Sequence, residues 1–252
     1  MDDTNPEESV DLGEALRNFK ATAPEPQTEP NYPKDRIATY RAFRDGVTNS
    51  QSVLHPSGGF DASPSKVFDN VTYVDIEDGN EGCVDVLRRA GLKAFRMDIR
   101  EYIPEEEHDL LILLNPSIST EWAARHITSG AYIISNNYHG NASEMHNEPD
   151  KYTLWGTIDL AERDHEKGHF RAEVSRDLTD LFTPAESGEE LRILRPDEYE
   201  FWEYSRRGIL ESMNIEPEER FEDMYMQFQR LMQEPEVLPS KRSSDDYIFV
   251  KK

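Results

Sequence analysis

Several polar residues in the first half of the chain each follow a short apolar run, an arrangement that can build a ligand site. The first group is the glycine pair Gly58 and Gly59, within the stretch HPSGGFD that runs from His55 through Ser57 to Asp61. Two glycines let the backbone turn tightly and let a ligand approach without meeting a Cβ atom. An ordinary turn between a strand and a helix is the alternative, and the pair alone does not decide between them.

Carboxylates follow the next two apolar runs. Asp75 ends VTYVD about 20 residues beyond the glycine turn, where a carboxylate can accept hydrogen bonds from both hydroxyls of a ribose. Glu77 is the second candidate for that role. Asp98 closes FRMD and could reach the amine of an adenine. A solvated strand end remains the alternative for Asp75, and an N-cap ahead of residues 99–102 the alternative for Asp98.

An amide follows the most apolar run, HDLLILL. Pro116 ends this strand, and the side chain of Asn115 offers donors and an acceptor to a substrate. Asn-Pro also marks turns, so both interpretations stay open. Tyr138 and His139 follow the next run and are candidate general bases, although polar loops collect such residues in any case.

These residues can meet only if the strands before them end side by side. The spacing of the apolar runs predicts a three-layer, doubly wound α/β fold with a mostly parallel sheet, in which ligands bind at the carboxyl ends of the strands. The expected strands cover 51–54, 71–76, 93–97, 109–114, 131–136, 152–160, 169–174 and 247–250, the last one returning to the sheet. The expected helices cover 34–45, 63–68, 80–90, 120–128, 196–213 and 217–232.

Three segments are expected along the chain. Residues 1–33 are rich in Asp, Glu, Pro and Thr and predict a disordered acidic tail. Residues 34–195 would form the α/β domain. Residues 196–252 would add helices rich in aromatic residues and Met, which could pack as a cap, form an oligomer face or cover a substrate. His165 and His169 lack the third ligand that a metal site needs, and no metal is expected.

The composition bounds the class of protein. The 252 residues carry a net charge of -23, and only nine of the 28 basic residues are Lys. Such an acidic, Lys-poor composition is typical of haloarchaea and their viruses, with an ordinary acidic cytosolic protein as the alternative. It disfavours nucleic acid as a partner at low salt without excluding it at high salt. The single Cys83 excludes an intramolecular disulfide. The absence of an 18-residue apolar run or a secretory signal predicts a cytoplasmic protein.

Taken in order, the glycine loop, VTYVDIE, RMDIRE, LLILLNPS and SGAYIISNN resemble the Rossmann-type S-adenosylmethionine-dependent methyltransferases, over roughly residues 36–137. The resemblance implies S-adenosylmethionine as the cofactor, with the glycine loop at its methionine end. It implies that Asp75 holds the ribose and Asp98 the adenine. It also implies that Asn115 and Pro116 lie beside the transferred methyl group.

The sequence departs from this family in the glycine loop. His55 stands where the family has an acidic residue, Ser57 where it has the first glycine and Asp61 where it has the third. Two functions are therefore expected from different classes. One is methyl transfer from S-adenosylmethionine to an unidentified acceptor, and the other is a non-catalytic interaction or virus-encoded protein that keeps the fold. A nicotinamide-dependent oxidoreductase fits less well, because the glycine fingerprint is poor.

Overall fold

The computed structural model describes residues 27–76, 82–116, 118–164, 167–183 and 240–252, which belong to one compact unit of the chain. The helices expected at 196–213 and 217–232 lie outside these residues, as do Glu77, His165 and most of the expected acidic tail. The described helices are α2 (Lys34–Gly46), η1 (Ser63–Lys66), α3 (Cys83–Arg89), α4 (Thr120–Ala124) and α5 (Asn141–Asn147). The described strands are β1 (Val53–Pro56), β2 (Val71–Asp75), β3 (Lys93–Arg96), β4 (His108–Leu113), β5 (Ile127–Ser135), β6 (Tyr152–Asp164), β7 (His169–Ser175) and β8 (Asp246–Lys251).

The strands form one sheet in the order β3-β2-β1-β4-β5-β8-β6-β7. The first five strands of this order pair in parallel, whereas β8 is antiparallel to β5 and β6, and β7 is antiparallel to β6. The chain runs outward from β1 to β3 and then returns to place β4 on the other side of β1. A doubly wound sheet opens a crevice at such a reversal, at the carboxyl ends of the strands. The expected α/β Rossmann-like fold is thereby confirmed.

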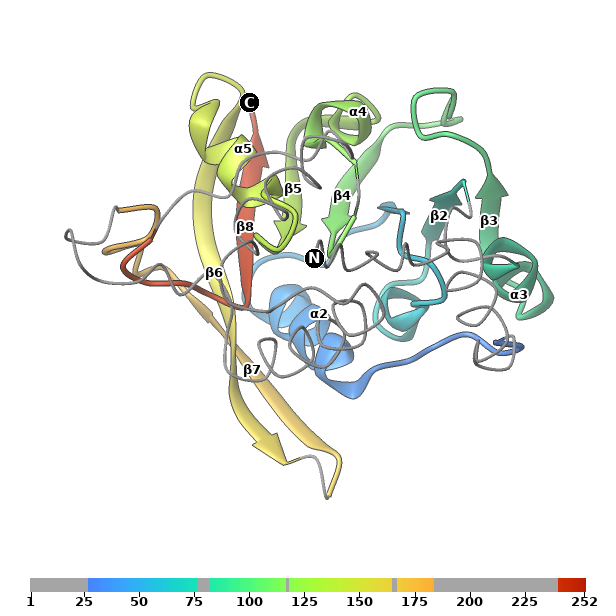
Figure 1. Cartoon of the computed structure of the whole chain (residues 1–252), viewed down its shortest axis with the longest axis horizontal. Helices are drawn as coiled ribbons and strands as arrows, with labels where there is room; N and C mark the ends of the chain where they lie inside the picture. The colour runs from blue at the N-terminus through green and yellow to red at the C-terminus, as the bar shows by residue number, and fades with distance from the viewer. Residues whose placement is uncertain (1–26, 77–81, 117, 165–166, 184–239) are drawn as a thin grey trace, which may run out of the picture. The chain divides into compact units, whose positions relative to one another are not determined.

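Helices cover both faces of the sheet, and each face has its own apolar core (Figure 1). Helices α2 and α3 bury Tyr40 and Leu87 in one core. Helices α4 and α5 bury Ala123 and Met145 in the other. The sheet is therefore the middle of three layers.

Strand β4 lies at the centre of the sheet and contributes side chains to both cores. Leu110 and Ile112 join the core beneath α2 and α3, whereas Leu111 and Leu113 join the core beneath α4 and α5. Successive side chains of a strand point to opposite faces, so a strand covered on both sides must be apolar throughout. This requirement explains the unbroken run that predicted the strand.

Several element boundaries differ from the sequence prediction, and those of β1, α4 and β5 differ because pairing between strands decides them. β1 covers Val53–Pro56, two residues later than expected, because each of its residues pairs with β2. His55 is consequently a buried strand residue and does not begin the loop. α4 begins after its predicted cap Ser119 but ends at Ala124, four residues early, because Ile127 already pairs with His108 as the start of β5.

Two local features differ from the sequence prediction. The short helix expected at 63–68 is a 3-10 turn, η1, that ends at Lys66, and Oδ1 of Asp61 accepts a hydrogen bond from the N–H of its first residue, Ser63, at 2.8 Å. α5 was missed because the sequence NASEMHN shows only two buried apolar residues, Ala142 and Met145, in seven.

The strand expected at 247–250 is β8, and it lies inside the sheet between β5 and β6. Tyr247 and Phe249 join one core and Ile248 the other, so β8 is covered on both faces. The Nζ of Lys251 donates to the carbonyls of Ala124 and Ile127. The sheet therefore depends on a segment far along the chain.

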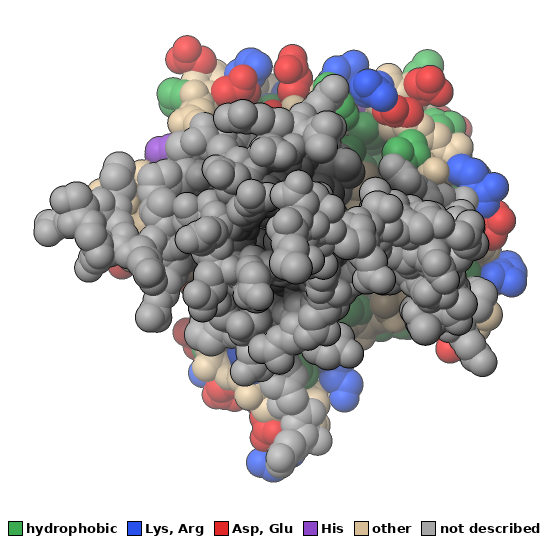
Figure 2. Space-filling view, in the orientation of Figure 1, with side chains coloured by type: hydrophobic (Ala, Val, Ile, Leu, Met, Phe, Trp, Pro, Cys, Tyr) green, Lys and Arg blue, Asp and Glu red, His purple; other side chains and the backbone are tan. Residues whose placement is uncertain are grey.

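The surface carries charges of both signs. On the face that Figure 2 shows, Asp and Glu side chains are interspersed with Lys and Arg around the described residues. Pairs such as Arg96 with Asp85 and Arg163 with Asp245 bring opposite charges into contact. No helix among the described ranges is long and apolar enough to span a membrane.

The buried side chain of His108, at the amino-terminal end of β4, links two hydroxyl groups. Its Nδ1 lies 2.9 Å from the Oγ of Ser52, and its Nε2 lies 3.1 Å from the hydroxyl of Tyr102. A neutral imidazole satisfies both contacts, with one nitrogen as donor and the other as acceptor. Burial is the main cause that lowers the pKa of His108 to about 4, and the nearby Lys93 acts in the same direction.

We expect His108 to make the protein less stable in acid. Between about pH 6.5 and about pH 4 the unfolded chain binds a proton at His108 and the folded chain does not, so stability falls as the pH falls. The contribution is on the order of 2–3 kcal/mol. Urea unfolding near neutral pH and near pH 4.5, repeated for His108→Gln, would measure it.

The exposed His169 supplies a control. His169→Gln should leave the loss of stability in acid unchanged, whereas His108→Gln should reduce it. An equal loss in His108→Gln and in the wild type would show that His108 is not the group responsible.

Candidate functional site

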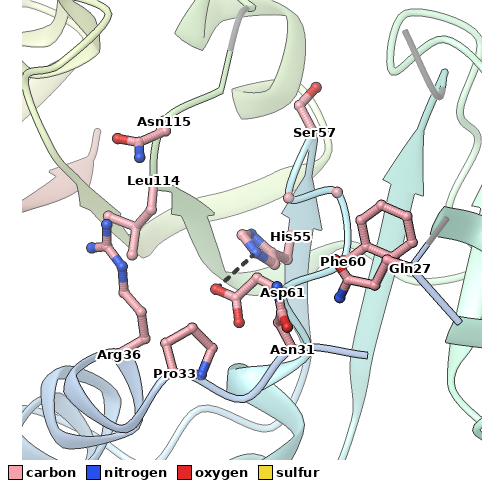
Figure 3. A pocket seen from close by; sticks show the side chains of 12 residues that line it. Gln27, Asn31, Pro33, Arg36, His55, Ser57, Phe60, Asp61, Leu114 and Asn115 are labelled. Carbon is pink, nitrogen blue, oxygen red and sulfur yellow. Dashed lines mark ion pairs between the residues drawn. The ribbon is translucent and has the colours of Figure 1, made fainter. Parts of the chain in front are cut away.

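A cavity of about 370 Å³ lies at the carboxyl ends of β1 and β4, where the strand order reverses (Figure 3). The loop after β1, the end of β4, the first turn of α2 and the segment before α2 all contribute to it. Its lining residues are Gln27, Asn31, Pro33, Arg36, His55, Ser57, Gly58, Gly59, Phe60, Asp61, Leu114 and Asn115. The lining thus includes six of the twelve residues that the sequence singled out.

Gly58 lacks a Cβ because the ring of His55 lies directly against it. A Cβ at this position would stand 2.3 Å from Nε2 of His55, which is closer than any real contact. The sequence suggested that the missing side chain makes room for a ligand. In the structure the space is taken by the imidazole, so Gly58 and His55 are matched to each other.

The rest of the loop is held in a strained turn. Ser57 has φ of 52° and Gly59 has φ of 57°, in the left-handed region that favours glycine. The N–H of Gly59 donates to Oδ2 of Asp75 at 3.1 Å, and the N–H of Ser57 donates to the carbonyl of Val74 at 2.9 Å. Ser57 therefore occupies a position with glycine-like geometry, and the end of β2 fixes the loop after β1.

The tautomer of neutral His55 follows from its contact with β4. Its Nδ1 lies 3.2 Å from the carbonyl of Ile112, and a carbonyl only accepts hydrogen bonds. The proton of the neutral ring therefore sits on Nδ1. Burial lowers the pKa of His55, although the nearby carboxylate of Asp61 acts in the opposite direction.

The Nε2 of His55 is buried and has no hydrogen-bond partner. Oδ2 of Asp61 lies 3.9 Å from it, which is beyond hydrogen-bond distance (Figure 3). The other oxygen of Asp61 accepts a hydrogen bond from the N–H of Ser63, the first residue of η1. A lone pair and a carboxylate thus face each other across a short gap at the wall of the cavity.

The segment before α2 packs along the loop. The N–H of Asn31 donates to the carbonyl of Phe60, and the N–H of Ala62 donates to the carbonyl of Asn31, both at 2.8 Å. These bonds pair Asn31 with Asp61 as an isolated parallel bridge. The cavity is consequently closed on one side by residues that the sequence assigned to the tail.

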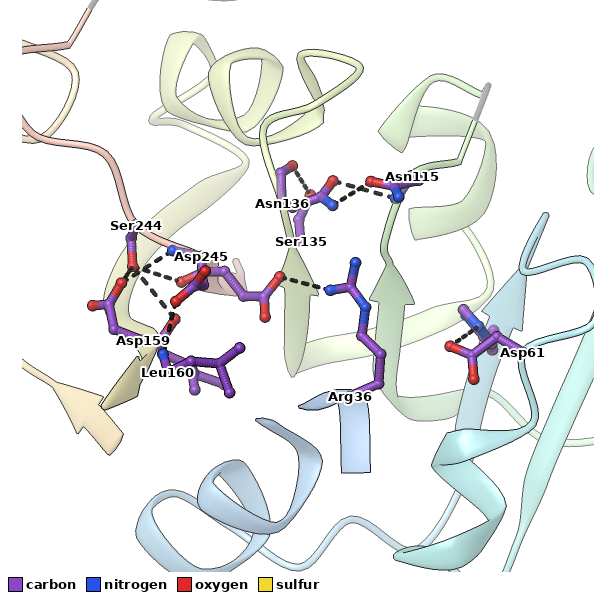
Figure 4. Close-up of polar contacts among 12 residues, drawn as sticks. Arg36, Asp61, Asn115, Ser135, Asn136, Asp159, Leu160, Ser244 and Asp245 are labelled. Atoms are coloured by element: carbon purple, nitrogen blue, oxygen red, sulfur yellow. Dashed lines mark hydrogen bonds and ion pairs between the residues drawn. The ribbon is translucent and has the colours of Figure 1, made fainter. Parts of the chain in front are cut away.

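Arg36 is the main site residue that the sequence analysis missed. Its Nη1 lies 3.4 Å from Oδ1 of the buried Asp246, and Figure 4 marks this ion pair with a dashed line from Arg36. Burial opposes the charge of Arg36, but Asp246 and other nearby groups outweigh it and raise the pKa of the guanidinium. Arg36 precedes the buried Tyr40 by one helical turn, and a charge at that spacing on an apolar stripe was the available signal.

Asn115 is held in a fixed orientation by Asn136 (Figure 4). The N–H of Asn115 donates to Oδ1 of Asn136 at 3.2 Å, and Nδ2 of Asn136 donates to Oδ1 of Asn115 at 2.5 Å. Because a backbone N–H can only donate, it fixes the amide of Asn136, which in turn fixes that of Asn115. The pair leaves the NH₂ group of Asn115 as a hydrogen-bond donor, while Pro116 is buried.

The opposite sides of the cavity differ in chemical character. Arg36 and Asn115 lie on one side, and His55 and Asp61 lie on the other (Figure 3). The first side offers hydrogen-bond donors and a positive charge. The second offers a lone pair and a negative charge, so the cavity suits a ligand whose own charges are separated in the opposite sense.

Other predicted site residues do not line this cavity. Asp75 is not part of the lining, and its Oδ2 accepts a hydrogen bond from the N–H of Gly59, which is. Both oxygens of Asp98 accept hydrogen bonds from Arg100, which lowers the pKa of that carboxyl. Tyr138 and His139 follow β5, with their ring centroids 4.6 Å apart. Their roles remain predictions.

Comparisons with known proteins find similar solved structures. No protein-family model and no curated protein matches the chain. Solved structures do resemble it, among them the N-methyltransferase NodS from Bradyrhizobium japonicum WM9 in complex with S-adenosyl-L-homocysteine, at 10% identity and a TM-score of 0.40, covering 67% of this chain and 100% of that one. A second is a possible histamine N-methyltransferase from Thermotoga maritima, at 11% identity and a TM-score of 0.42. The match covers 66% of this chain and 90% of that one. A third is the sugar N-methyltransferase KedS8 from Streptoalloteichus sp. ATCC 53650, at 13% and 0.36, covering 65% of each chain.

The contact between Gly58 and His55 predicts a specific pattern of stability. Gly58→Ala should destabilise the protein by roughly 1–3 kcal/mol, because the new methyl group overlaps a buried ring. In a His55→Ser background the same substitution should cost much less, since the ring is gone. Chemical unfolding of the four proteins of this cycle would measure the difference.

Gly91 is a matched control because it has φ of 81° and a Cβ added there would meet no atom within 4 Å. Gly91→Ala should cost about 1 kcal/mol from backbone strain, regardless of the residue at position 55. If Gly58→Ala were equally costly in both backgrounds, the proposed contact would not be the cause.

Proposed function

We propose that this chain is an S-adenosylmethionine-dependent methyltransferase whose methyl acceptor is unassigned. The observation that carries the proposal is the cavity at the reversal of the strand order, with Arg36 on one side and Asp61 on the other. A cavity with opposite charges on its two sides suits a small zwitterion. The methionine end of S-adenosylmethionine is an α-amino acid and carries both charges.

Arg36 is the residue that suits the carboxylate of this amino acid. Asp246 engages Nη1 of its guanidinium, which has five N–H donors in a planar fork. The NH₂ group of Asn115, oriented by Asn136, lies on the same side of the cavity and adds further donors. Charge-assisted hydrogen bonds of this kind are about twice as strong as neutral ones.

The nucleoside would lie toward β2 and β3. The cavity volume of about 370 Å³ is in the range of small-molecule sites, roughly 300–1,000 Å³. Asp75 supports the proposal because its carboxylate stands at the end of the neighbouring strand and already holds Gly59. We propose that it accepts hydrogen bonds from the ribose hydroxyls, as the resemblance implies. Asp98 would have to release Arg100 before it could bind an adenine.

The chemistry would require alignment more than proton transfer. The sulfonium of the bound cofactor supplies an activated methyl group, so the protein mainly has to orient the acceptor and exclude water. Asn115 and Pro116 stand at the mouth of β4, where the acceptor would approach. Tyr138 and His139 follow the neighbouring strand and remain the candidates for a general base.

The acidic composition supports a further part of the proposal, that the protein works at high salt. The net charge of -23 would cause strong self-repulsion at low ionic strength, and salt would screen it. Binding experiments should accordingly be made in concentrated KCl.

Calorimetric titration with S-adenosylmethionine and S-adenosylhomocysteine tests the proposal. The wild-type protein should bind both, and Arg36→Met should weaken binding by roughly 10- to 100-fold, because a charged hydrogen bond to the carboxylate is lost. Asp75→Ala should abolish binding, because it removes both the proposed ribose ligand and the anchor of Gly59.

Arg44 provides the matched control, because it lies on the same helix and pairs with the exposed Asp45. Arg44→Met should bind both ligands as the wild type does. No heat at millimolar ligand, with circular dichroism showing a folded protein, would contradict the proposal and favour a non-catalytic interaction protein.

A further inference from the structure

We propose that the neutral imidazole of His55 acts as a hydrogen-bond acceptor and, together with Asp61, selects ligands that carry a primary ammonium group. The inference deepens the proposed function and depends on it for the choice of nucleoside probe. The geometry that carries it is the gap of 3.9 Å between Nε2 of His55 and Oδ2 of Asp61 at the wall of the cavity.

The first step is the state of the histidine. The Nδ1–H of the neutral ring donates a hydrogen bond to the carbonyl of Ile112, which leaves a lone pair on Nε2. His55 is 1% exposed, and this nitrogen has no partner. A buried acceptor without a donor destabilises the folded protein, so its retention calls for an explanation.

The second step is the facing carboxylate. Oδ1 of Asp61 accepts a hydrogen bond from the N–H of Ser63, and the main chain around Asp61 is held by Asn31, so Oδ2 cannot easily turn away. Two acceptors separated by 3.9 Å cannot bond to each other. If a nitrogen were placed about 2.9 Å from both acceptors, the angle between the two acceptor atoms at that nitrogen would be roughly 85°. One donor atom with at least two hydrogens could therefore bridge the gap after small adjustments.

The third step is the charge of the bridging group. Asp61 and Asp75 lie on the His55 side and favour a cation, whereas Arg36 lies across the cavity and disfavours one close to itself. A hydroxyl has a single hydrogen and could satisfy only one of the two acceptors. Within the described ranges no three His, Cys, Asp or Glu side chains are grouped to hold a metal ion. A primary ammonium meets all these conditions.

The inference also accounts for the departure of the loop from the family that it resembles. His55 stands where an acidic residue is expected. A neutral histidine keeps an acceptor at that position without burying a second negative charge beside Asp61. The negative charge that attracts the ammonium is then supplied by Asp61, which follows His55 by six residues in the chain.

A pair of ligands tests the assignment. S-Adenosylhomocysteine and its deaminated analogue, in which a hydrogen replaces the ammonium group, would be titrated against wild type, His55→Phe and His55→Gln. Wild type should prefer the amine by at least about tenfold. His55→Phe keeps an aromatic ring without an acceptor and should lose most of this preference. His55→Gln offers an amide oxygen and should recover part of it.

A second measurement reads the imidazole directly and does not require a nucleoside. In protein labelled with ¹⁵N at histidine, the Nε2 resonance of His55 should move on addition of L-methionine but not of 4-(methylthio)butyrate, its deaminated counterpart. A shift with L-methionine and no binding of S-adenosylhomocysteine would overturn the proposed function and leave the ammonium site standing.

Two results would overturn the inference itself. One is an unchanged preference for the amine in a folded His55→Phe variant. The other is an Nε2 resonance that responds equally to both probes or to neither, with thermal unfolding showing an intact protein.

Discussion

The burial of His55 is the constraint on which the site depends. Its ring fills the space beneath the glycine loop, and a contact with the carbonyl of Ile112 joins it to the neighbouring strand β4. The loop above it is tied to β2 by the bond from Gly59 to Asp75. Three adjacent strands are thus connected through a few polar contacts at the reversal of the sheet. The shape of the cavity follows from this arrangement, because the loop cannot move without disturbing the ring.

The side of the cavity that carries Arg36 depends on a contact between distant parts of the chain. Arg36 on α2 meets Asp246 at the start of β8, 210 residues later. Asp246 is almost completely buried, and a buried carboxylate requires a charged or hydrogen-bonding partner. The pair leaves part of the guanidinium to face the cavity. The proposed function would therefore combine a structural ion pair and a binding group in one side chain.

The architecture could be predicted from the sequence because short apolar runs mark the strands of the sheet. β4 is apolar throughout since both of its faces are covered, and the polar residues that follow each strand meet at one edge because the strands are parallel. The glycine pair and Asp61 were placed at the site for the same reason.

What sequence alone could not supply are relations between segments. The ends of β1 are set by its pairing with β2, which moved His55 from the loop into the sheet. Asn136 was overlooked because its role is to orient Asn115, 21 residues away. Arg36 was part of a helix whose apolar stripe predicted packing, and only its distant partner reveals its second role.

The place of β8 in the sheet has a consequence for how the protein reaches its fold. β7 ends at Ser175, and β8 begins about 70 residues later in the chain, yet β8 is the strand that joins β5 to β6. The hairpin of β6 and β7 can pair locally, but until β8 arrives it has no neighbour in the sheet, and β5 presents an open edge. Pairing strands that lie so far apart in the chain is entropically costly, and unpaired edges promote association between chains. Completion of the sheet is thus expected to be a late step in folding, and chains released before that step would be those most prone to aggregate.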